Sequence, residues 1–340
     1  MPALTRRELF RAAGGAGAAL LLAGCAAGPS PSASKPPLQP VKAAWVARTA
    51  GQTLWPLAKE AGYFEKYGLN VDLQFLENST LAIPAMVSGE LGPVAMAGAA
   101  VVGAQAAGSD LIMIAGLQNQ SIFRIMGVSG IDRIEDLKGK TVAVVQIGSN
   151  DYYIWQRIMA RQGWGQNDLK FAAANSLQGQ IALLQRGDAQ AIAVSPPNNV
   201  LAENQGGHQI LDTAALNAPE QNLGVTVMRT YFSANRATCL AMLKATIEAV
   251  HRYRTDPTFT RNVIRNMLQS DDQRFIDAGF DAYLSIFPTE PYPTRDGFAE
   301  TISEIASRND KAANLKPEQL MDTSLVDELK NSGFIKQVFG

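Results

Sequence analysis

Apolar and polar positions follow two patterns along the chain, one typical of strands and the other of helices. The segment VDLQF at residues 71–75 has a period of two, which places its apolar side chains on one face of a strand. Between residues 54 and 64 the apolar positions follow helical spacing, and Gly68 supplies a stop signal. Further strands are expected at 41–47, 94–97, 111–115 and 123–128. This alternation predicts an α/β fold with mostly parallel sheets flanked by helices.

The order of these elements repeats after about one hundred residues. MVSGE at 86–90 corresponds to LQRGD at 184–188, and Asn78 corresponds to Asn175. Each of these segments precedes an apolar run that is expected to form a strand. The repetition predicts two lobes, each with its own sheet.

After the second repeat the sequence becomes mainly helical, apart from one strand expected at 223–228. A return of the chain to the first lobe near residues 217–221 makes that lobe discontinuous. We therefore expect lobe 1 to comprise residues 41–127 and 222–340, and lobe 2 to comprise residues 128–221.

The first 24 residues have the layout of a secretory signal, with a basic head, a short apolar stretch and then small residues. The apolar stretch is shorter than the roughly 20 residues that span a bilayer, so we expect no transmembrane anchor. Leu22 to Cys25 resembles the lipobox of bacterial lipoproteins, and Thr5 to Phe10 resembles the twin-arginine export motif. The resemblance implies a signal peptide over residues 1–24 and a lipid on Cys25. The alternative is an ordinary signal peptide that contains a cysteine.

Residues 25–40 are rich in Pro, Ser and Ala and lack apolar periodicity, so they predict a flexible tether. A chain with this N-terminus is expected to work in the periplasm or cell envelope, anchored to a membrane through the lipid on Cys25.

Composition narrows the choice of partners. Hydrophobic residues make up 46% of the chain and charged residues 18%, which predicts a packed globular core. The net charge of −1 offers no electrostatic basis for binding nucleic acid. The sequence has neither metal-ligand spacing nor a phosphate loop or nucleophile elbow. We therefore predict no metal, no cofactor and no catalytic residues.

Three stretches carry a family resemblance: AKEAGYFEKYGLNV at 58–71, IEDLKGKTVAV at 134–144, and the Gly148-Ser149 pair. They resemble periplasmic substrate-binding proteins of ABC transporters, in the group for sulfonates, nitrate, taurine and thiamine precursors. Relatives often have an Asp where this chain has Gly92-Pro93. The resemblance implies a periplasmic-binding-protein type II fold, with the ligand in the cleft between the lobes. Hinge bending can close such lobes, and residues 128–130 and 217–219 are hinge candidates, with plain surface loops as the alternative.

The resemblance also implies a function. A solute receptor of an ABC importer catches a small organic ligand and delivers it to a permease and its ATPase in the inner membrane. It works as a monomer and without catalysis. One alternative is a ligand-sensing lipoprotein for a signalling receptor. Another is an enzyme similar to thiamine-pyrimidine synthases, which carry a cysteine-rich segment and an active-site histidine. The histidines here, His208 and His251, do not follow predicted strand ends.

Ligands of open α/β sheets bind beyond the carboxyl ends of the strands, so we expect site residues in the loops there. Ser149 and Asn150 begin a predicted helix, whose free N–H groups can hold an anion or a carbonyl oxygen, although every helix also needs an N-cap. Trp55 can stack on a flat ligand or anchor the core. The expected ligand-binding residues are Gln52, Trp55, Asn78, Gly98, Gln118, Ser149, Asn150, Tyr152, Asn175 and Pro196.

Most of these loops lack Lys and Arg, and the nearest cations are Arg48 and Arg124. A densely charged anion usually recruits arginine forks. We therefore expect a neutral or singly charged organic ligand. The sequence leaves open whether it is a sulfonate, a nitrate- or taurine-like compound, a pyrimidine or an aromatic acid.

Overall fold

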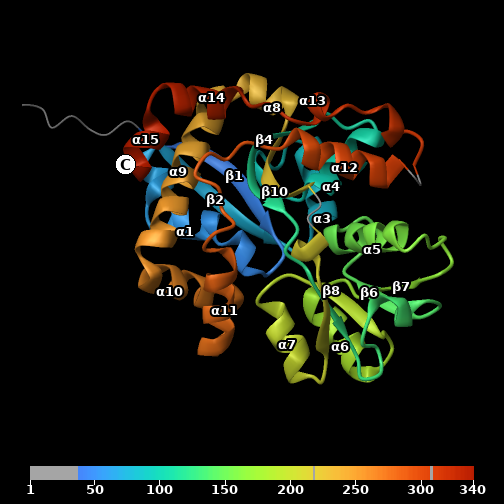
Figure 1. Cartoon of the computed structure of the whole chain (residues 1–340). Coiled ribbons are helices and arrows are strands. Elements are labelled where there is room, and N and C mark those ends of the chain that lie inside the picture. Colours follow the sequence, from blue (N-terminus) through green and yellow to red (C-terminus); the bar gives the residue numbers. More distant parts are fainter. Residues whose placement is uncertain (1–36, 217–218, 307–308) are drawn as a thin grey trace, which may run out of the picture. The chain divides into compact units, whose positions relative to one another are not determined.

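The computed structural model describes residues 37–216, 219–306 and 309–340. Within this part of the chain the strands form two five-stranded sheets (Figure 1). The predicted signal peptide over residues 1–24, Cys25 and residues 26–36 of the tether lie outside the described residues. The predicted tether extends too far, because its last two residues, Gln39 and Pro40, pair with β2 (Leu69–Leu76) as the start of β1 (Gln39–Val46).

The two sheets have matching strand orders. In spatial order, the first consists of β2 (Leu69–Leu76), β1 (Gln39–Val46), β3 (Val94–Met96), β10 (Pro219–Met228) and β4 (Leu111–Gln120). The second consists of β7 (Lys170–Ala173), β6 (Thr141–Val144), β8 (Ala191–Val194), β5 (Arg124–Gly127) and β9 (His208–Asp212). We call the first sheet with its helices lobe 1 and the second with its helices lobe 2.

Helices cover both sheets. Those of lobe 1 are α1 (Leu54–Glu60), α2 (Tyr63–Lys66), α3 (Ser79–Val87), α4 (Gly98–Ala106), α8 (Arg229–Ala234), α9 (Arg236–Thr255), α10 (Pro257–Leu268), α11 (Gln273–Tyr283), α12 (Arg295–Ala306), α13 (Pro317–Leu320), α14 (Ser324–Asn331) and α15 (Phe334–Phe339). Those of lobe 2 are α5 (Asn150–Arg161), α6 (Leu177–Arg186) and α7 (Asn198–Asn204). Short 3₁₀ turns occur at η1 (Ala50–Gln52), η2 (Ile134–Leu137), η3 (Thr213–Leu216) and η4 (Ala312–Asn314). No helix among the described residues combines the length and apolar character needed to cross a membrane.

Each sheet contains one strand that runs against the others. In lobe 1, β1 is parallel to β2 and β3, whereas β10 lies antiparallel between β3 and β4. In lobe 2, β6 is parallel to β7 and β8, whereas β5 lies antiparallel between β8 and β9. The sheets are therefore mixed. Both reversed strands are the first that the chain forms after crossing from the other sheet, and local sequence patterns do not encode that direction.

The chain crosses between the sheets twice. Residues 121–123 lead from β4 to β5, and the segment that begins with η3 leads from β9 back to β10. Ser121 Oγ and Thr213 Oγ1 lie 2.5 Å apart, so a hydrogen bond ties the two crossings together. β5 belongs to the second sheet, although the sequence boundary after residue 127 assigned it to lobe 1. The hinge candidate at 128–130 accordingly follows β5 inside lobe 2.

The second hinge candidate falls partly outside the described residues, which exclude Asn217 and Ala218. Pro219, its last residue, begins β10.

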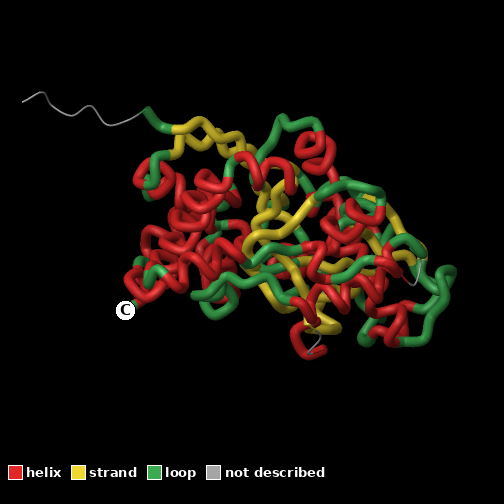
Figure 2. Tube along the Cα trace, turned by 90° about the horizontal axis from the view of Figure 1, so that it is seen from above, coloured by secondary structure: helices red, strands yellow, loops and turns green. Residues whose placement is uncertain are grey.

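Each lobe has its own core. In lobe 1, one apolar cluster joins the sheet to α1, α9, α10 and α11, and another joins it to α3, α4 and α12 (Figure 1). Seen from above, the helices lie on both sides of the strands (Figure 2). In lobe 2, Trp155 of α5 is fully buried against the second sheet, and α6 covers another apolar cluster. The cleft between the lobes is therefore free to be lined by polar groups.

At Gly224 of β10, the neighbouring atoms leave no room for a side chain. A Cβ there would lie 2.2 Å from Met113 Sδ and 2.4 Å from the carbonyl oxygen of Ala115. We expect Gly224→Ala to lower the free energy of unfolding by about 1–3 kcal/mol through overpacking, measured by urea denaturation. Gly165→Ala is the control, because its Cβ meets nothing closer than 3.9 Å. Equal losses in both variants would contradict the close packing of β10.

Candidate functional site

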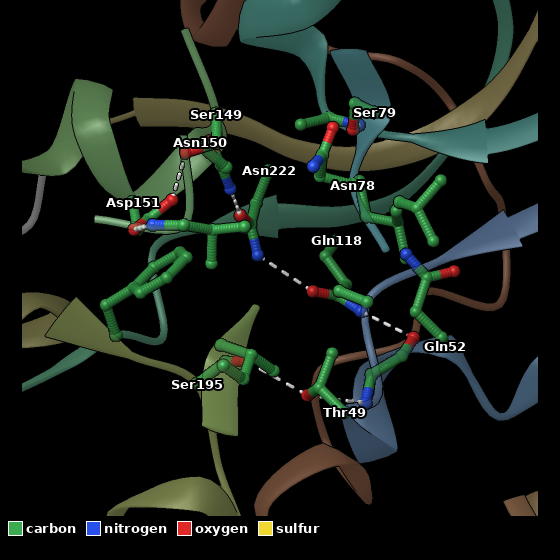
Figure 3. A pocket seen from close by; sticks show the side chains of 18 of the residues that line it. Thr49, Gln52, Asn78, Ser79, Gln118, Ser149, Asn150, Asp151, Ser195 and Asn222 are labelled. Atoms are coloured by element: carbon green, nitrogen blue, oxygen red, sulfur yellow. Dashed lines mark hydrogen bonds between the residues drawn. The ribbon is translucent and has the colours of Figure 1, made fainter. Parts of the chain in front are cut away.

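A cavity of about 90 Å³ lies between the two lobes. This volume holds several water molecules or a small organic ligand. The cavity is lined by the loops that follow β1, β2, β3, β4, β6 and β8. Its polar lining from lobe 1 is Thr49, Gln52, Glu77, Asn78, Ser79, Gln118, Asn222 and Tyr283. Its polar lining from lobe 2 is Ser149, Asn150, Asp151 and Ser195. Figure 3 labels all of these residues except Glu77 and Tyr283, and shows those of lobe 1 facing those of lobe 2.

A chain of amide side chains crosses the cavity (Figure 3). Gln118, at the end of β4, donates from Nε2 to the carbonyl oxygen of Gly51 at 2.8 Å. Asn222 of β10 donates from Nδ2 to Gln118 Oε1, also at 2.8 Å. Asn150, at the start of α5, donates to Asn222 Oδ1. The last bond joins lobe 2 to lobe 1, so this chain of amides is complete only when the lobes are closed.

A second polar contact closes the opposite side of the cavity. Thr49 Oγ1 donates to the carbonyl oxygen of Pro196 at 2.9 Å and accepts from Ser195 Oγ at 3.0 Å. Tyr283 of α11 also donates to the Pro196 carbonyl, at 3.3 Å. Burial raises the pKa of Tyr283 to about 12, so its hydroxyl keeps the donated proton at neutral pH.

Asp151 places a buried carboxylate at the N-terminus of α5. It accepts hydrogen bonds from Val145 N at 2.7 Å, from Gln180 Nε2 at 2.8 Å and from Ser149 Oγ. Burial raises the pKa of Asp151 to about 6, against the lowering effect of these hydrogen bonds. The Asp151 carboxylate thus occupies the N-terminus of α5, the kind of helix end that can bind an anionic ligand.

The cavity has an acidic lining. Among the described residues that line it, Glu77 and Asp151 carry acidic side chains and none is basic. Arg48 donates to the carbonyl oxygen of Met267 at 3.2 Å, and Arg124 is paired with Asp212. Neither of these two predicted neighbouring cations belongs to the described lining.

The NMT1/THI5 like family is described by a sequence model that matches residues 53–258, more than half of the chain. The chain belongs to this family. No curated protein sequence matches it.

Solved structures share the fold of this NMT1/THI5-like chain. A protein from Bordetella bronchiseptica RB50 has a TM-score of 0.75 and 19% identity, over 86% of this chain and 97% of the other. The periplasmic aliphatic sulphonate binding protein SsuA from Escherichia coli has a TM-score of 0.68 and 19% identity, over 84% and 92%. The periplasmic nitrate-binding protein NrtA from Synechocystis PCC 6803 has a TM-score of 0.70 and 13% identity, over 89% and 91%. The predicted two-lobed periplasmic-binding-protein type II fold is confirmed.

Half of the residues expected from the sequence line the cavity, namely Gln52, Asn78, Gln118, Ser149 and Asn150. Asn78 also serves as an N-cap, because its Oδ1 accepts from Leu81 N at 3.1 Å. Gln52 is 6% exposed, and its Oε1 has no hydrogen-bond partner among the described residues. A buried amide oxygen without a partner carries a desolvation cost that a donor on a ligand can remove.

The other expected residues lie outside the lining. Trp55 is a core anchor, whose Nε1 donates to Thr246 Oγ1 at 3.0 Å. Tyr152 packs its ring 5.1 Å from that of Phe171. Gly98 begins α4, where its lack of a side chain allows close approach to Gln221.

Asn175 and Pro196 also fall outside it, each for a local reason. Asn175 adopts a left-handed backbone with φ 62°, and Ser176 caps α6 in its place. Pro196 contributes a carbonyl oxygen that binds Thr49 and Tyr283, so it acts on the contact between the lobes.

Sequence reasoning missed several lining residues. Thr49, Asp151 and Ser195 fall within loops that the strand ends predicted, and the acidic residue in the first turn of a helix was the available signal for Asp151. Asn222 and Tyr283 had no such signal, because β10 and α11 bring them to the cavity from much later in the chain.

Asp151→Asn should change the pH dependence of stability. The folded-state pKa of Asp151 lies above its ordinary value, so the folded protein binds more protons than the unfolded one between about pH 4 and 6. The carboxylate therefore lowers the free energy of unfolding as pH rises through this range. Relative to wild type, the free energy of unfolding of the Asn variant should rise by on the order of 2 kcal/mol between pH 4 and pH 7, measured by urea denaturation.

The amide can keep the contacts of the carboxylate, accepting from Val145 N and Gln180 and donating to Ser149 Oγ. Asp188→Asn removes an exposed acid of the same lobe and is the control. An equal change with pH in both variants would rule out the buried Asp151 as its source.

Proposed function

We propose that the protein is the solute receptor of an ABC importer, binding a small organic ligand between its lobes and delivering it to a permease and ATPase of the inner membrane. The observation that carries this proposal is the closed cavity, which takes polar groups from both lobes. Such an arrangement couples ligand capture to lobe closure. Membership of the NMT1/THI5-like family and the solute-binding neighbours SsuA and NrtA support it. The proposal treats the receptor as a monomer.

The charge of the cavity supports a ligand that is neutral or positively charged. Asp151 and Glu77 repel an anion such as nitrate or a sulfonate, and no basic side chain of the described lining offsets them. Gln52 Oε1 offers an acceptor, and the surrounding amides and hydroxyls offer further donors and acceptors. Of the ligand classes compatible with the sequence, a pyrimidine with amino groups or a compound bearing an amine fits best.

An enzymatic function receives no support from the described residues. His208 lies on β9 beside Asp132, and the ring of His251 packs against Phe339. Neither lines the cavity, and Cys239 is buried in α9. A sensor that signals to a receptor would use the same cavity, so binding of the permease distinguishes the importer from it.

Ligand binding is testable by thermal unfolding against a panel of pyrimidines, amines, taurine, alkyl sulfonates, nitrate and aromatic carboxylates. A ligand at about 100 times its Kd should stabilise the wild type by roughly 2.7 kcal/mol. We expect pyrimidines or amines to raise the unfolding midpoint and nitrate to leave it unchanged. Stabilisation by anions alone would contradict the proposed ligand class.

The cavity is tested by Asn150→Ala, which removes the hydrogen bond to Asn222 across the cleft. We expect this variant to lose most of the ligand-induced shift. Asn167→Ala, at an exposed position of the same lobe, should keep it. Equal shifts in the two variants would place the ligand elsewhere.

We further propose that residues 1–24 are removed as a signal peptide and that a lipid on Cys25 anchors the chain through the segment that precedes β1. In cells, Cys25→Ser should abolish incorporation of labelled fatty acid and move the protein from the membrane fraction to the soluble fraction. Cys239→Ala is the control and should keep the label, because Cys239 is buried in the core of lobe 1. Membrane retention of Cys25→Ser would show another anchor.

A further inference from the structure

A buried ion cluster joins the two lobes away from the ligand cavity. Arg157 of α5 reaches from lobe 2 to two carboxylates of lobe 1, Glu220 on β10 and Glu304 on α12. Its Nη1 lies 3.0 Å from Glu220 Oε2, and its Nη2 lies 3.1 Å from Glu304 Oε2, with Nε completing a two-point contact to Glu304. The side chains are 4%, 4% and 8% exposed, so water screens these contacts very little.

We propose that Arg157, Glu220 and Glu304 form a latch that holds the lobes closed and so sets how long a ligand is retained. The inference rests on the proposed function in so far as a receptor must open and close. Arg157 lies on lobe 2, and both carboxylates that it contacts lie on lobe 1. Opening therefore separates Arg157 from both carboxylates at once.

The energetics make the latch sensitive to its charges. Burying three charges is costly, and their mutual hydrogen bonds repay that cost only when all partners are present. Removal of Arg157 takes away the charge and the hydrogen bonds that it gives to two carboxylates that stay buried in the closed form. The open form does not carry this cost, because there water solvates the carboxylates. Loss of the arginine should thus favour the open form rather than simply weaken each lobe.

The same cluster couples closure to pH. Burial raises the pKa of Glu304 to about 7 in the closed arrangement. The negative charges of Glu220 and Glu300 also raise this pKa, whereas Arg157 lowers it. Of the other elements packed against α12, α4 and η4 carry no charged side chain, and Glu318 of α13 is paired with Arg295. In the open form, hydration returns the pKa toward its ordinary value. Closing therefore takes up a proton, and lower pH favours the closed form between about pH 5 and 7.

Asp151 also lines the cavity and has a raised pKa, although its hydrogen-bond partners all lie in lobe 2. A variant at Glu304 is needed to isolate the contribution of the latch.

The test measures lobe opening without a ligand. Spin labels at Leu81→Cys and Ile147→Cys report the width of the cleft, because both positions are exposed and each is close in sequence to cavity-lining residues of its own lobe. The full chain carries Cys25→Ser in every sample. Burial raises the pKa of the Cys239 thiol to about 12, which keeps it unlabelled near neutral pH.

We expect the ligand-free wild type at pH 6 to show mainly the short inter-label distance in pulsed electron paramagnetic resonance. Arg157→Met keeps most of the side-chain length and should raise the ratio of open to closed molecules by at least about tenfold. Arg186→Met breaks an exposed ion pair within lobe 2 and should leave the ratio unchanged. A mainly open wild type, or Arg157→Met with the wild-type distances, would overturn the latch.

Glu304→Gln keeps a hydrogen-bond acceptor for Arg157 but does not titrate. We expect it to stay closed at pH 7, and the ratio of open to closed molecules to change less between pH 5 and 7 than in wild type. If Glu304→Gln kept the pH response of wild type, Glu304 would not be the source of that response. This measurement remains possible even if Arg157→Met does not fold. Because these distances need no ligand, the latch can be confirmed even if the ligand panel and permease binding refute the importer function, so the two failures are distinguishable.

Discussion

Buried polar groups at the boundary between two sheets are the constraint on which the molecule depends. Thr49 finds its partners in Ser195 and Pro196, and Asn222 finds one in Asn150, each time across the cleft. A buried polar group without a partner costs more than a made hydrogen bond returns. The closed arrangement is therefore selected by polar pairing, while each lobe keeps its apolar core to itself.

One strand takes part in two of the contacts across this boundary. β10 returns from lobe 2 and runs antiparallel between β3 and β4, with Gly224 allowing the close approach. It carries Glu220 to the ion cluster and Asn222 to the chain of amides. The same strand follows the second crossing between the lobes. The cavity lining, the ion cluster and the second crossing thus meet in one short segment.

The acidic lining of the cavity is a property of this chain's own side chains and does not follow from the shared fold. Proteins described as sulphonate- and nitrate-binding have the same two-lobed fold. Here the helix terminus that can hold an anion is occupied by the Asp151 carboxylate, which accepts hydrogen bonds from Val145 N and Gln180 Nε2. Similarity of fold therefore does not determine the charge of the ligand that a protein binds. The charge of the site depends on a few side chains at the strand ends.

Local pattern was enough to predict the alternation of strands and helices, the two lobes, and the loops at the strand ends that hold Gln52, Asn78, Gln118, Ser149 and Asn150. Periodicity and strand ends are properties of neighbouring residues, so one sequence suffices to read them. The directions of β5 and β10, the arrival of Asn222 and Tyr283, and the pairing of Arg157 with Glu304 were settled by tertiary structure. These contacts join residues far apart in the chain, and no local property of either partner specifies the other.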